Sequence, residues 1–115
     1  ENVRFLGVRT DIGEILQGMD VFLFPSRYEG LGIASVEAQV SGLPVYASTN
    51  VPRESNVTGL CSFMELGNPE KWAQAIVSCD INNRRGYVEE CRRAGYDIND
   101  KAKWLQDFYL SLSKC

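Results

Sequence analysis

Apolar residues alternate with polar ones, or run together, in short segments that predict strands and helices in turn along the first half of the chain. The order expected is a strand at 3–6, a short helix that ends near residue 18, a strand at 21–24, a helix that ends at 41–42 and a strand at 44–47. The continuously apolar run Val21–Phe24 stands directly before Pro25, which is typical of a fully buried parallel strand. Strands and helices that alternate with short connections indicate right-handed βαβ units, and hence an α/β fold with a parallel sheet flanked by helices.

Helix-start signals support the first helix and a later one. Asp11 is the expected N-cap of the first helix, with Glu14 as its capping-box partner. Asn68 followed by Pro69 resembles another helix start. The second half is otherwise expected to hold a short strand within 59–66, a helix around 72–77, a helix around 87–94, a turn at 97–100 and a final helix at 101–112.

Composition describes one small soluble domain and excludes several kinds of chemistry. The chain has 115 residues, of which 44% are apolar, and it has no histidine. Without histidine, neither Ser-His-Asp or Cys-His catalysis nor a histidine-ligated metal site is available. With a net charge of -3, the chain lacks the excess of basic residues that is typical of a nucleic-acid-binding protein.

Targeting and cysteine patterns point to a cytoplasmic protein. No apolar run approaches the roughly 20 residues that span a bilayer, and no signal-peptide pattern opens the chain. The four cysteines form no C-x-x-C pair and are expected as free thiols: Cys61, Cys79, Cys91 and Cys115. The chain begins at Glu1, directly on an expected strand, so we expect a fragment of a longer protein.

The segment 26–37 is the strongest candidate for a binding site. It lies at the carboxyl end of a buried strand and opens into a helix, which is where open parallel sheets bind ligands. Gly30 and Gly32 allow a ligand to approach the backbone closely, and the amides of Leu31, Gly32 and Ile33 could hold a phosphate at the start of the helix. A tight strand-to-helix turn without a ligand is the alternative.

Two carboxylates flank these glycines. Glu37 follows Ile33 by four residues and adjoins Val36, on the helix face expected to pack against the sheet. An acid there needs hydrogen-bond donors, which either the protein or a ligand such as a vicinal diol supplies. Glu29 precedes the helix, in the loop where a ligand would enter. Solvated glutamates are the alternative at both positions.

Seven residues separate Glu29 from Glu37 in Phe-Pro-Ser-Arg-Tyr-Glu-Gly-Leu-Gly-Ile-Ala-Ser-Val-Glu-Ala, and Ser-Gly-Leu-Pro-Val-Tyr-Ala-Ser follows. This pattern resembles the E-x7-E motif of retaining glycosyltransferases of the GT-B fold. It is most similar to the large group 1 family (family 4), which builds bacterial capsular polysaccharides and exopolysaccharides. The resemblance covers nearly the whole chain, because Phe5-Leu6-Gly7 looks like the family's preceding strand and segments 95–98 and 102–105 resemble the closing part of polysaccharide-type members.

The resemblance implies two Rossmann-like domains that face each other across a cleft. Residues 1–115 would form most of the C-terminal, nucleotide-sugar-binding domain, with the N-terminal acceptor domain absent. Glu29 would be the catalytic residue in contact with the donor sugar, Glu37 would bind the ribose hydroxyls, and the helix-start amides would bind the diphosphate. Donor-binding positions implied in this way are Gly30, Leu31, Gly32, Ile33, Glu37 and Arg9. The loop 8–10 would line the nucleobase, with Ser48 and Thr49 near the same pocket.

This chain departs from the family pattern at the diphosphate. The Arg and Lys that usually neutralise it are absent, so Arg9, Arg27 and Arg53 are candidate substitutes, with solvated or locally paired arginines as the alternative. The segment 49–54 lacks the Gly-Gly often present in relatives, and no D-x-D pair indicates a metal. Because phosphate charge neutralisation contributes strongly to such a transition state, the isolated fragment is expected to be inactive.

The function implied is hexosyl transfer from a nucleotide-sugar, with uridine diphosphate as the expected carrier, to a glycan or lipid-linked acceptor with retention. No cofactor is expected beyond that donor. Peripheral association of the parent enzyme with the inner face of the membrane is compatible with this function. A nucleotide-sugar epimerase of the same fold is one alternative, and a non-catalytic nucleotide-binding or interaction module is another.

Aromatic residues at helical spacing in the second half are expected in core or interdomain packing rather than in sugar stacking. They are Trp72, Tyr87, Trp104, Phe108 and Tyr109. The last helix is expected to cover apolar surface of the other domain in an intact enzyme, and so to be exposed or in dimer contacts in this chain.

Overall fold

A computed structural model describes residues 2–113, in which three short parallel strands form one sheet. The strands are β1 (Phe22–Phe24), β2 (Val45–Ser48) and β3 (Cys61–Met64), in the order β1-β2-β3. Phe22 lies opposite Val45, which in turn lies opposite Cys61. Helices cover the sheet, so the predicted α/β class with a parallel sheet is confirmed.

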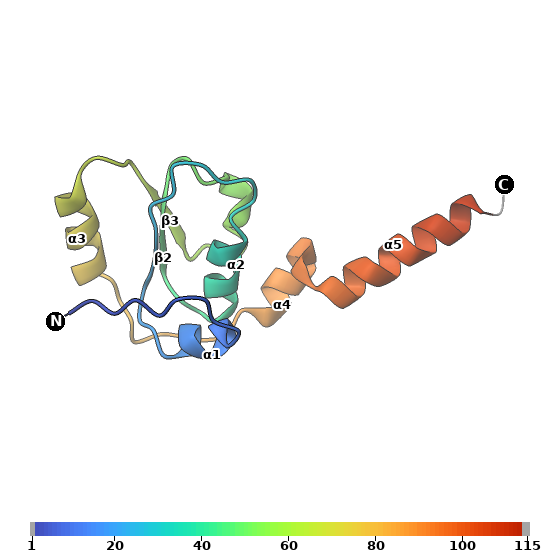
Figure 1. The fold of residues 1–115 in the computed structure, drawn as a ribbon, viewed down its shortest axis with the longest axis horizontal. Helices are drawn as coiled ribbons and strands as arrows, with labels where there is room; N and C mark the ends of the chain where they lie inside the picture. Colours follow the sequence, from blue (N-terminus) through green and yellow to red (C-terminus); the bar gives the residue numbers. More distant parts are fainter. Residues whose placement is uncertain (1, 114–115) are drawn as a thin grey trace.

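The helices form a layer on each side of the sheet (Figure 1). The helix α1 (Ile12–Gln17) and the helix α2 (Ile33–Val40) lie on one side, and α3 (Pro69–Val77) lies on the other. The main core lies between the sheet and the α1 and α2 layer, and it consists of Leu16, Ala38, Leu43, Val45, Ala47, Val51 and Cys61, with Phe22, Phe24 and Phe63 packed against it. On the other side, the Tyr46 hydroxyl donates to the Ala75 carbonyl of α3 at 3.0 Å.

The strand β1 is less buried than its sequence predicts. Phe22 and Phe24 pack against the core, but Leu23 points to the other face and is 46% exposed. Since β1 is an edge strand within the described residues, its outer side has no neighbouring strand to shield it. The prediction of a fully buried strand was therefore wrong, although its parallel pairing is confirmed.

The strand expected at 3–6 does not form. These residues have no hydrogen-bonded neighbour within residues 2–113, and Phe5 is 95% exposed. The segment passes as an irregular trace to α1 (Figure 1). A β-prone sequence becomes a strand only when another strand accepts its hydrogen bonds, and the sequence pattern cannot supply that partner.

The helix starts show both a confirmed and a failed cap prediction. Asn68 caps α3, because its Oδ1 accepts from the Lys71 amide at 3.1 Å, and Pro69 is the first helical residue. Asp11 stands at the N-cap of α1, but its carboxylate makes no capping bond. It binds Arg9 instead, so the predicted capping box with Glu14 is absent.

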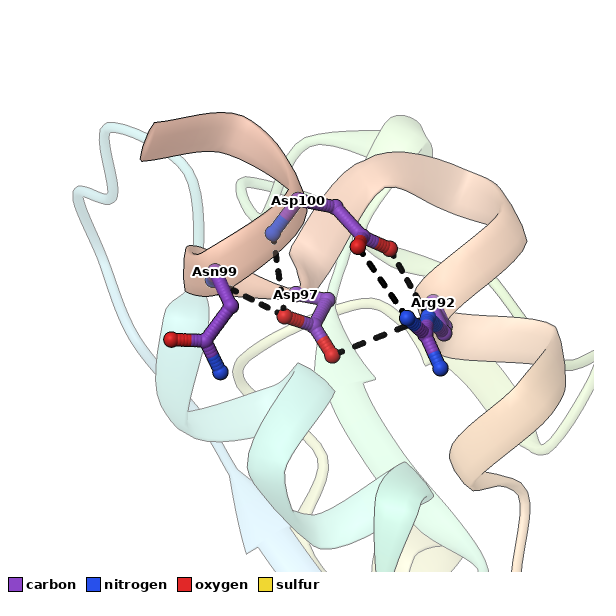
Figure 2. A network of polar contacts seen from close by, with 4 residues as sticks. All are labelled: Arg92, Asp97, Asn99 and Asp100. Atoms are coloured by element: carbon purple, nitrogen blue, oxygen red, sulfur yellow. Dashed lines mark hydrogen bonds and ion pairs between the residues drawn. The ribbon is translucent and has the colours of Figure 1, made fainter. Parts of the chain in front are cut away.

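The C-terminal part consists of α4 (Val88–Cys91), η2 (Arg92–Tyr96) and α5 (Ile98–Leu112). The residues 97–100, expected as a turn, instead start α5, because Asp97 accepts from the amides of Asn99 and Asp100. Arg92 donates to both carboxylate oxygens of Asp100, at 2.7 and 3.1 Å, and its Nε lies 3.8 Å from Asp97 (Figure 2). These contacts join the two helical segments across the bend at Gly95.

The helix α5 projects from the rest of the molecule (Figure 1). With this helix, the molecule measures 61 Å along its longest axis and 29 Å along the next. Trp104, Phe108 and Tyr109 are exposed, and Trp104 stacks on Phe108. The exposure expected for this helix is confirmed, and these three aromatics do not pack into the core of the described residues. Trp72, in contrast, is buried, and its indole N–H donates to the Glu65 carbonyl at 2.9 Å.

The described residues contain no helix that is long and apolar enough to cross a membrane. Cys61, Cys79 and Cys91 are free thiols, as predicted, and Cys115 lies outside the described residues. Burial raises the pKa of the Cys61 thiol, which keeps it protonated.

Candidate functional site

The loop from Pro25 to Gly32 connects the carboxyl end of β1 to α2, at the sheet edge where the sequence predicts a site. Hydroxyl groups hold this loop in place. The Ser48 hydroxyl donates to the Ser26 carbonyl, and the Ser26 hydroxyl lies 2.9 Å from the Tyr28 carbonyl and 3.1 Å from Glu29 Oε1. The residue predicted as catalytic is thus positioned by its own loop and by β2. Ser48 is fully buried, and its hydroxyl serves this structural role.

The two predicted glycines have different structural roles. Gly32 is the N-cap of α2 with φ of 75°, and a Cβ on it would lie 3.1 Å from Val51 Cγ1. Both its left-handed backbone and its close packing therefore require glycine. A Cβ on Gly30 would meet no atom within 4 Å. The fold does not require glycine at that position, and its small size leaves the loop open to solvent.

The amides predicted to bind phosphate are not used by the protein. Within residues 2–113, the N–H groups of Leu31, Gly32 and Ile33 donate to no acceptor. The first N–H groups of a helix have no partner inside the helix and carry the positive end of its dipole. The start of α2 is therefore an electropositive surface with free donors, which suits a phosphate group.

Glu37 lies on a different face of α2 from the one expected. It is exposed and lines a hollow of about 210 Å³ between α1 and α2, together with residues that include Ile12 and Leu16. Ile33 is also exposed, at 57%. The predicted sheet-facing position of Glu37 was therefore wrong, and Glu37 instead lies at the hollow beside α1.

The reason is a buried polar network that sequence reasoning missed. The side chain of Gln39 is fully buried and donates to the carbonyl of Ser35 at 3.1 Å and to that of Ser55 at 2.7 Å. Its Oε1 accepts from the Thr58 hydroxyl at 2.8 Å. Because these bonds satisfy a polar side chain in the interior, α2 turns inward the face that consists of Ser35, Val36, Ala38 and Gln39. Half of that face is polar, so apolar periodicity alone does not identify it.

The three candidate arginines differ in how far they are already engaged. Arg9 binds both oxygens of Asp11, at 2.8 and 2.6 Å, and this hydrogen bonding lowers the pKa of the Asp11 carboxyl and raises that of Arg9. The guanidinium of Arg53 lies 4.3 Å from the centre of the Phe63 ring. Arg27 is exposed and has no hydrogen bond or ion pair within the part of the chain that the structure describes. The alternative of a locally paired arginine therefore applies to Arg9.

The remaining predicted positions lie in two different places. The loop 8–10 is exposed and leads into α1, whose first residues line the hollow beside Glu37. The Thr49 amide donates to the Met64 carbonyl at 3.1 Å. Thr49 therefore lies directly after β2, beside the end of β3. Among residues 2–113, no three His, Cys, Asp or Glu side chains gather as metal ligands.

Comparison with known proteins gives a consistent family. A family model described as "Glycosyl transferases group 1" matches residues 1–80. EpsF of Bacillus subtilis (strain 168), which is named as a glycosyltransferase, is 34% identical over 94% of this chain and 29% of its own length. A UDP-Gal:alpha-D-GlcNAc-diphosphoundecaprenol alpha-1,3-galactosyltransferase of Escherichia coli is 30% identical over 93% of this chain and 29% of its own length.

A third relative, a D-inositol 3-phosphate glycosyltransferase of Corynebacterium kroppenstedtii, is 33% identical over 93% of this chain and 26% of its own length. The chain thus spans less than a third of these relatives. No solved structure matches the chain significantly.

Proposed function

The chain belongs to the group 1 glycosyltransferases, and from that membership we propose that it forms the nucleotide-sugar-binding part of a glycosyltransferase. The observation that carries the proposal is the start of α2. There, the amides of Leu31, Gly32 and Ile33 have no acceptor in the described chain, and Gly32 fixes the backbone that presents them. Uridine diphosphate is the proposed carrier, in keeping with the UDP-Gal donor in the name of the Escherichia coli relative.

The proposed binding mode places each part of the donor against one group of residues. The diphosphate binds the free amides of α2, which stabilise the charge that develops as it leaves. Glu37 accepts from the ribose hydroxyls, on the side of α2 that faces α1. The nucleobase lies against the loop 8–10, which leads into α1. Arg9 belongs to that loop, but Asp11 already offsets its charge.

The proposed reaction is transfer of a hexosyl group to a glycan or lipid-linked acceptor with retention of anomeric configuration. Glu29 contacts the donor sugar from the loop ahead of α2. The name of the Escherichia coli relative includes an acceptor linked to diphosphoundecaprenol, which supports a lipid-linked acceptor and contact of the whole enzyme with a membrane surface. The acceptor-binding part and the rest of the catalytic machinery then belong to the remaining length of the enzyme.

Binding of nucleotides to the chain tests this proposal. Isothermal titration with uridine diphosphate is expected to show binding that Glu37→Ala weakens by about 1 to 3 kcal/mol, because a charge-assisted hydrogen bond is lost. Guanosine diphosphate, titrated in parallel, tests the choice of base. Glu70→Ala is the matched control, since Glu70 is an exposed helical glutamate on α3, which lies on the other side of the sheet.

Circular dichroism of each variant separates a binding role from a structural one. Because Glu37 is exposed, we expect its alanine variant to remain folded. An unfolded variant would show a structural role for this glutamate. Absence of binding by both nucleotides would refute the donor-binding proposal and favour an interaction module.

A further inference from the structure

The hollow beside Glu37 lies between two helices that are anchored unequally. The helix α2 buries four of its residues and is held by the hydrogen bonds of Gln39. The helix α1 has six residues, of which only Leu16 is buried. A helix this short is not stable by itself, so contacts with the rest of the chain hold it in place. The width of the hollow therefore depends on the contacts that hold α1.

Arg84 supplies such a contact. Its Nη2 donates to the Leu16 carbonyl at 2.8 Å, and its Nη1 donates to the Gln17 carbonyl at 2.9 Å. Its Nε donates to the carbonyl of Ser41, the C-cap of α2, at 2.9 Å. Within residues 2–113, the hydrogen bonds from Arg84 are the only ones that join α1 to a part of the chain distant in sequence. One guanidinium thus connects the ends of both helices.

The backbone that carries Arg84 is attached to α2. The Tyr87 amide donates to the Val40 carbonyl at 3.1 Å. Gly42 has φ of 77°, and a Cβ at this position would overlap the Arg85 carbonyl, so the chain packs closely here. Because its base is fixed to one helix, the guanidinium determines how far the other helix lies from it.

The bonds from Arg84 end on residues that line the hollow. Leu16 and Ser41, whose carbonyls accept from Arg84, belong to the lining together with Glu37. Arg84 itself does not belong to it. Because α1 precedes β1 and α2 precedes β2, these helix ends lie at the amino edge of the sheet, opposite to the loop that carries Glu29. Any effect of Arg84 on a ligand beside Glu37 therefore passes through the two helices.

We propose that Arg84 is a positioning residue for donor binding, because it sets the separation of α1 and α2 and thereby the shape of the hollow in which Glu37 meets the ribose. This inference rests on the proposed function, which places the ribose there. Loss of Arg84 would move α1 relative to Glu37 without removing any group that contacts the donor. The diphosphate, bound at the amides that start α2, does not contact α1, so its binding should not depend on Arg84.

Titration with two ligands tests the proposal. Uridine diphosphate occupies the hollow and the start of α2, whereas inorganic pyrophosphate binds only at the start of α2. We expect Arg84→Ala to weaken binding of uridine diphosphate by about fivefold and to leave binding of pyrophosphate unchanged. The amide resonances of Leu31 and Gly32 are the readout for both ligands. Arg84→Lys should have a smaller effect, because an ammonium group can donate to some of the same carbonyls.

Two comparisons separate positioning from a general loss of stability. Tyr46→Phe removes the hydrogen bond to Ala75 on the α3 side of the sheet, and it should leave binding of both ligands unchanged. Glu37→Ala combined with Arg84→Ala should weaken binding of uridine diphosphate by less than the product of the two separate effects, because both substitutions act on the same hollow.

Distances between spin labels report the position of α1 without any ligand. Labels replace the exposed side chains of Glu14 on α1 and Glu70 on α3, which lies on the other side of the sheet. We expect a narrow distance distribution for the unchanged chain and a broader one for Arg84→Ala. Should Arg84→Ala fail to fold, Arg84→Lys provides the same comparisons with smaller effects.

The outcomes distinguish this proposal from the donor-binding one. Unchanged binding of uridine diphosphate, equal weakening of uridine diphosphate and pyrophosphate, or an unchanged label distribution would overturn the positioning role of Arg84. Absence of uridine diphosphate binding by the unchanged chain would refute the donor-binding proposal instead. The label distances then decide alone: a broader distribution in the Arg84 variant supports its control of the separation of α1 and α2, and an unchanged one overturns it.

Discussion

At the scale of single residues, Gly30 and Gly32 allow fold and ligand binding to be separated. Gly32→Ala is expected to lower the free energy of unfolding by about 1 to 3 kcal/mol, because Gly32 has φ of 75° and its Cβ would press on Val51. Gly30→Ala should change that free energy by less than about 0.5 kcal/mol, since its Cβ meets open space. Urea denaturation of both variants measures the difference.

Nucleotide titration of the Gly30 variant completes this prediction. If the donor passes close to the loop, Gly30→Ala should weaken binding of uridine diphosphate although the protein stays folded. Stability of the Gly32 variant equal to that of the unchanged chain would contradict the structural role assigned to its left-handed backbone.

The sequence was sufficient to find the residues of the loop but not the direction of every side chain. The strand-to-helix position of Gly30 and Gly32 follows from local patterns, and so it could be predicted. The face of α2 that carries Glu37 could not, because apolar Ile33 suggested an inward stripe, whereas Ile33 is exposed and Gln39 is buried beside Val36. Gln39 is inside because the backbone of Ser55 and the side chain of Thr58 meet it there, and such distant partners leave no periodic signal.

At the scale of the elements, Arg84 joins helix ends on the edge of the molecule opposite to the site. Its guanidinium donates to the carbonyls of Leu16 and Gln17 in the last turn of α1, of Met19 just after it and of Ser41 at the C-cap of α2, at distances from 2.6 to 2.9 Å. Helix C-termini carry carbonyl groups without intrahelical partners and a partial negative charge. One cation therefore satisfies the ends of two helices.

Arg84→Ala is accordingly expected to lower the free energy of unfolding by about 2 to 3 kcal/mol, the cost of leaving several carbonyls without a donor. Thermal denaturation measures this loss. Arg93→Ala serves as the control, because Arg93 makes no hydrogen bond or ion pair within residues 2–113 and should change stability little. An equal effect of the two substitutions would contradict the role of Arg84.

Elements were predicted well where their signals are local. The order of strands and helices from 21 to 77 follows from apolar runs, from glycine and proline breaks and from the cap at Asn68, all of which act within a few residues. The strand at 3–6 failed because a strand needs a partner outside itself. The start of α5 was placed late because Asp97 and Asp100 read as turn residues, whereas Asp97 is the N-cap of the helix.

At the scale of the whole molecule, two hollows of about 280 and 610 Å³, which share Leu66 and Gly67 in their lining, could not be predicted from the sequence alone. Their lining combines residues from three loops and one helix, and only the packing of the sheet brings them together. Trp72 was correctly expected to pack rather than to stack on a sugar. That it also lines a hollow depends on Pro25, which lies far from it along the chain, in the loop after β1.

Ion pairs lie at the base of α5, where they are expected to hold its direction relative to the rest of the molecule (Figure 2). Arg92 binds Asp100 and lies near Asp97, and the hydrogen bonds from Arg92 lower the pKa of the Asp100 carboxyl below its ordinary value. An aspartate with an ordinary pKa titrates at about pH 4. Because the pKa of Asp100 is lower in the folded protein, its ion pair with Arg92 is fully present above about pH 4 and is lost as the pH falls through the lowered pKa. Acid should therefore loosen the bend between η2 and α5.

Distances between spin labels on α3 and α5 measure this effect. At neutral pH, we expect a narrow distance distribution for the unchanged chain and a broader one for Arg92→Gln, because the glutamine cannot form the paired bonds to Asp100. On acidification, the unchanged chain should broaden toward the distribution of the variant, whereas the variant should change little while circular dichroism still shows a folded sheet. Arg85→Gln, which removes a different exposed ion pair with Glu90 on α4, should leave the neutral distribution narrow. A distribution for Arg92→Gln as narrow as that of the unchanged chain would show that helix packing alone directs α5, and that the ion pairs do not.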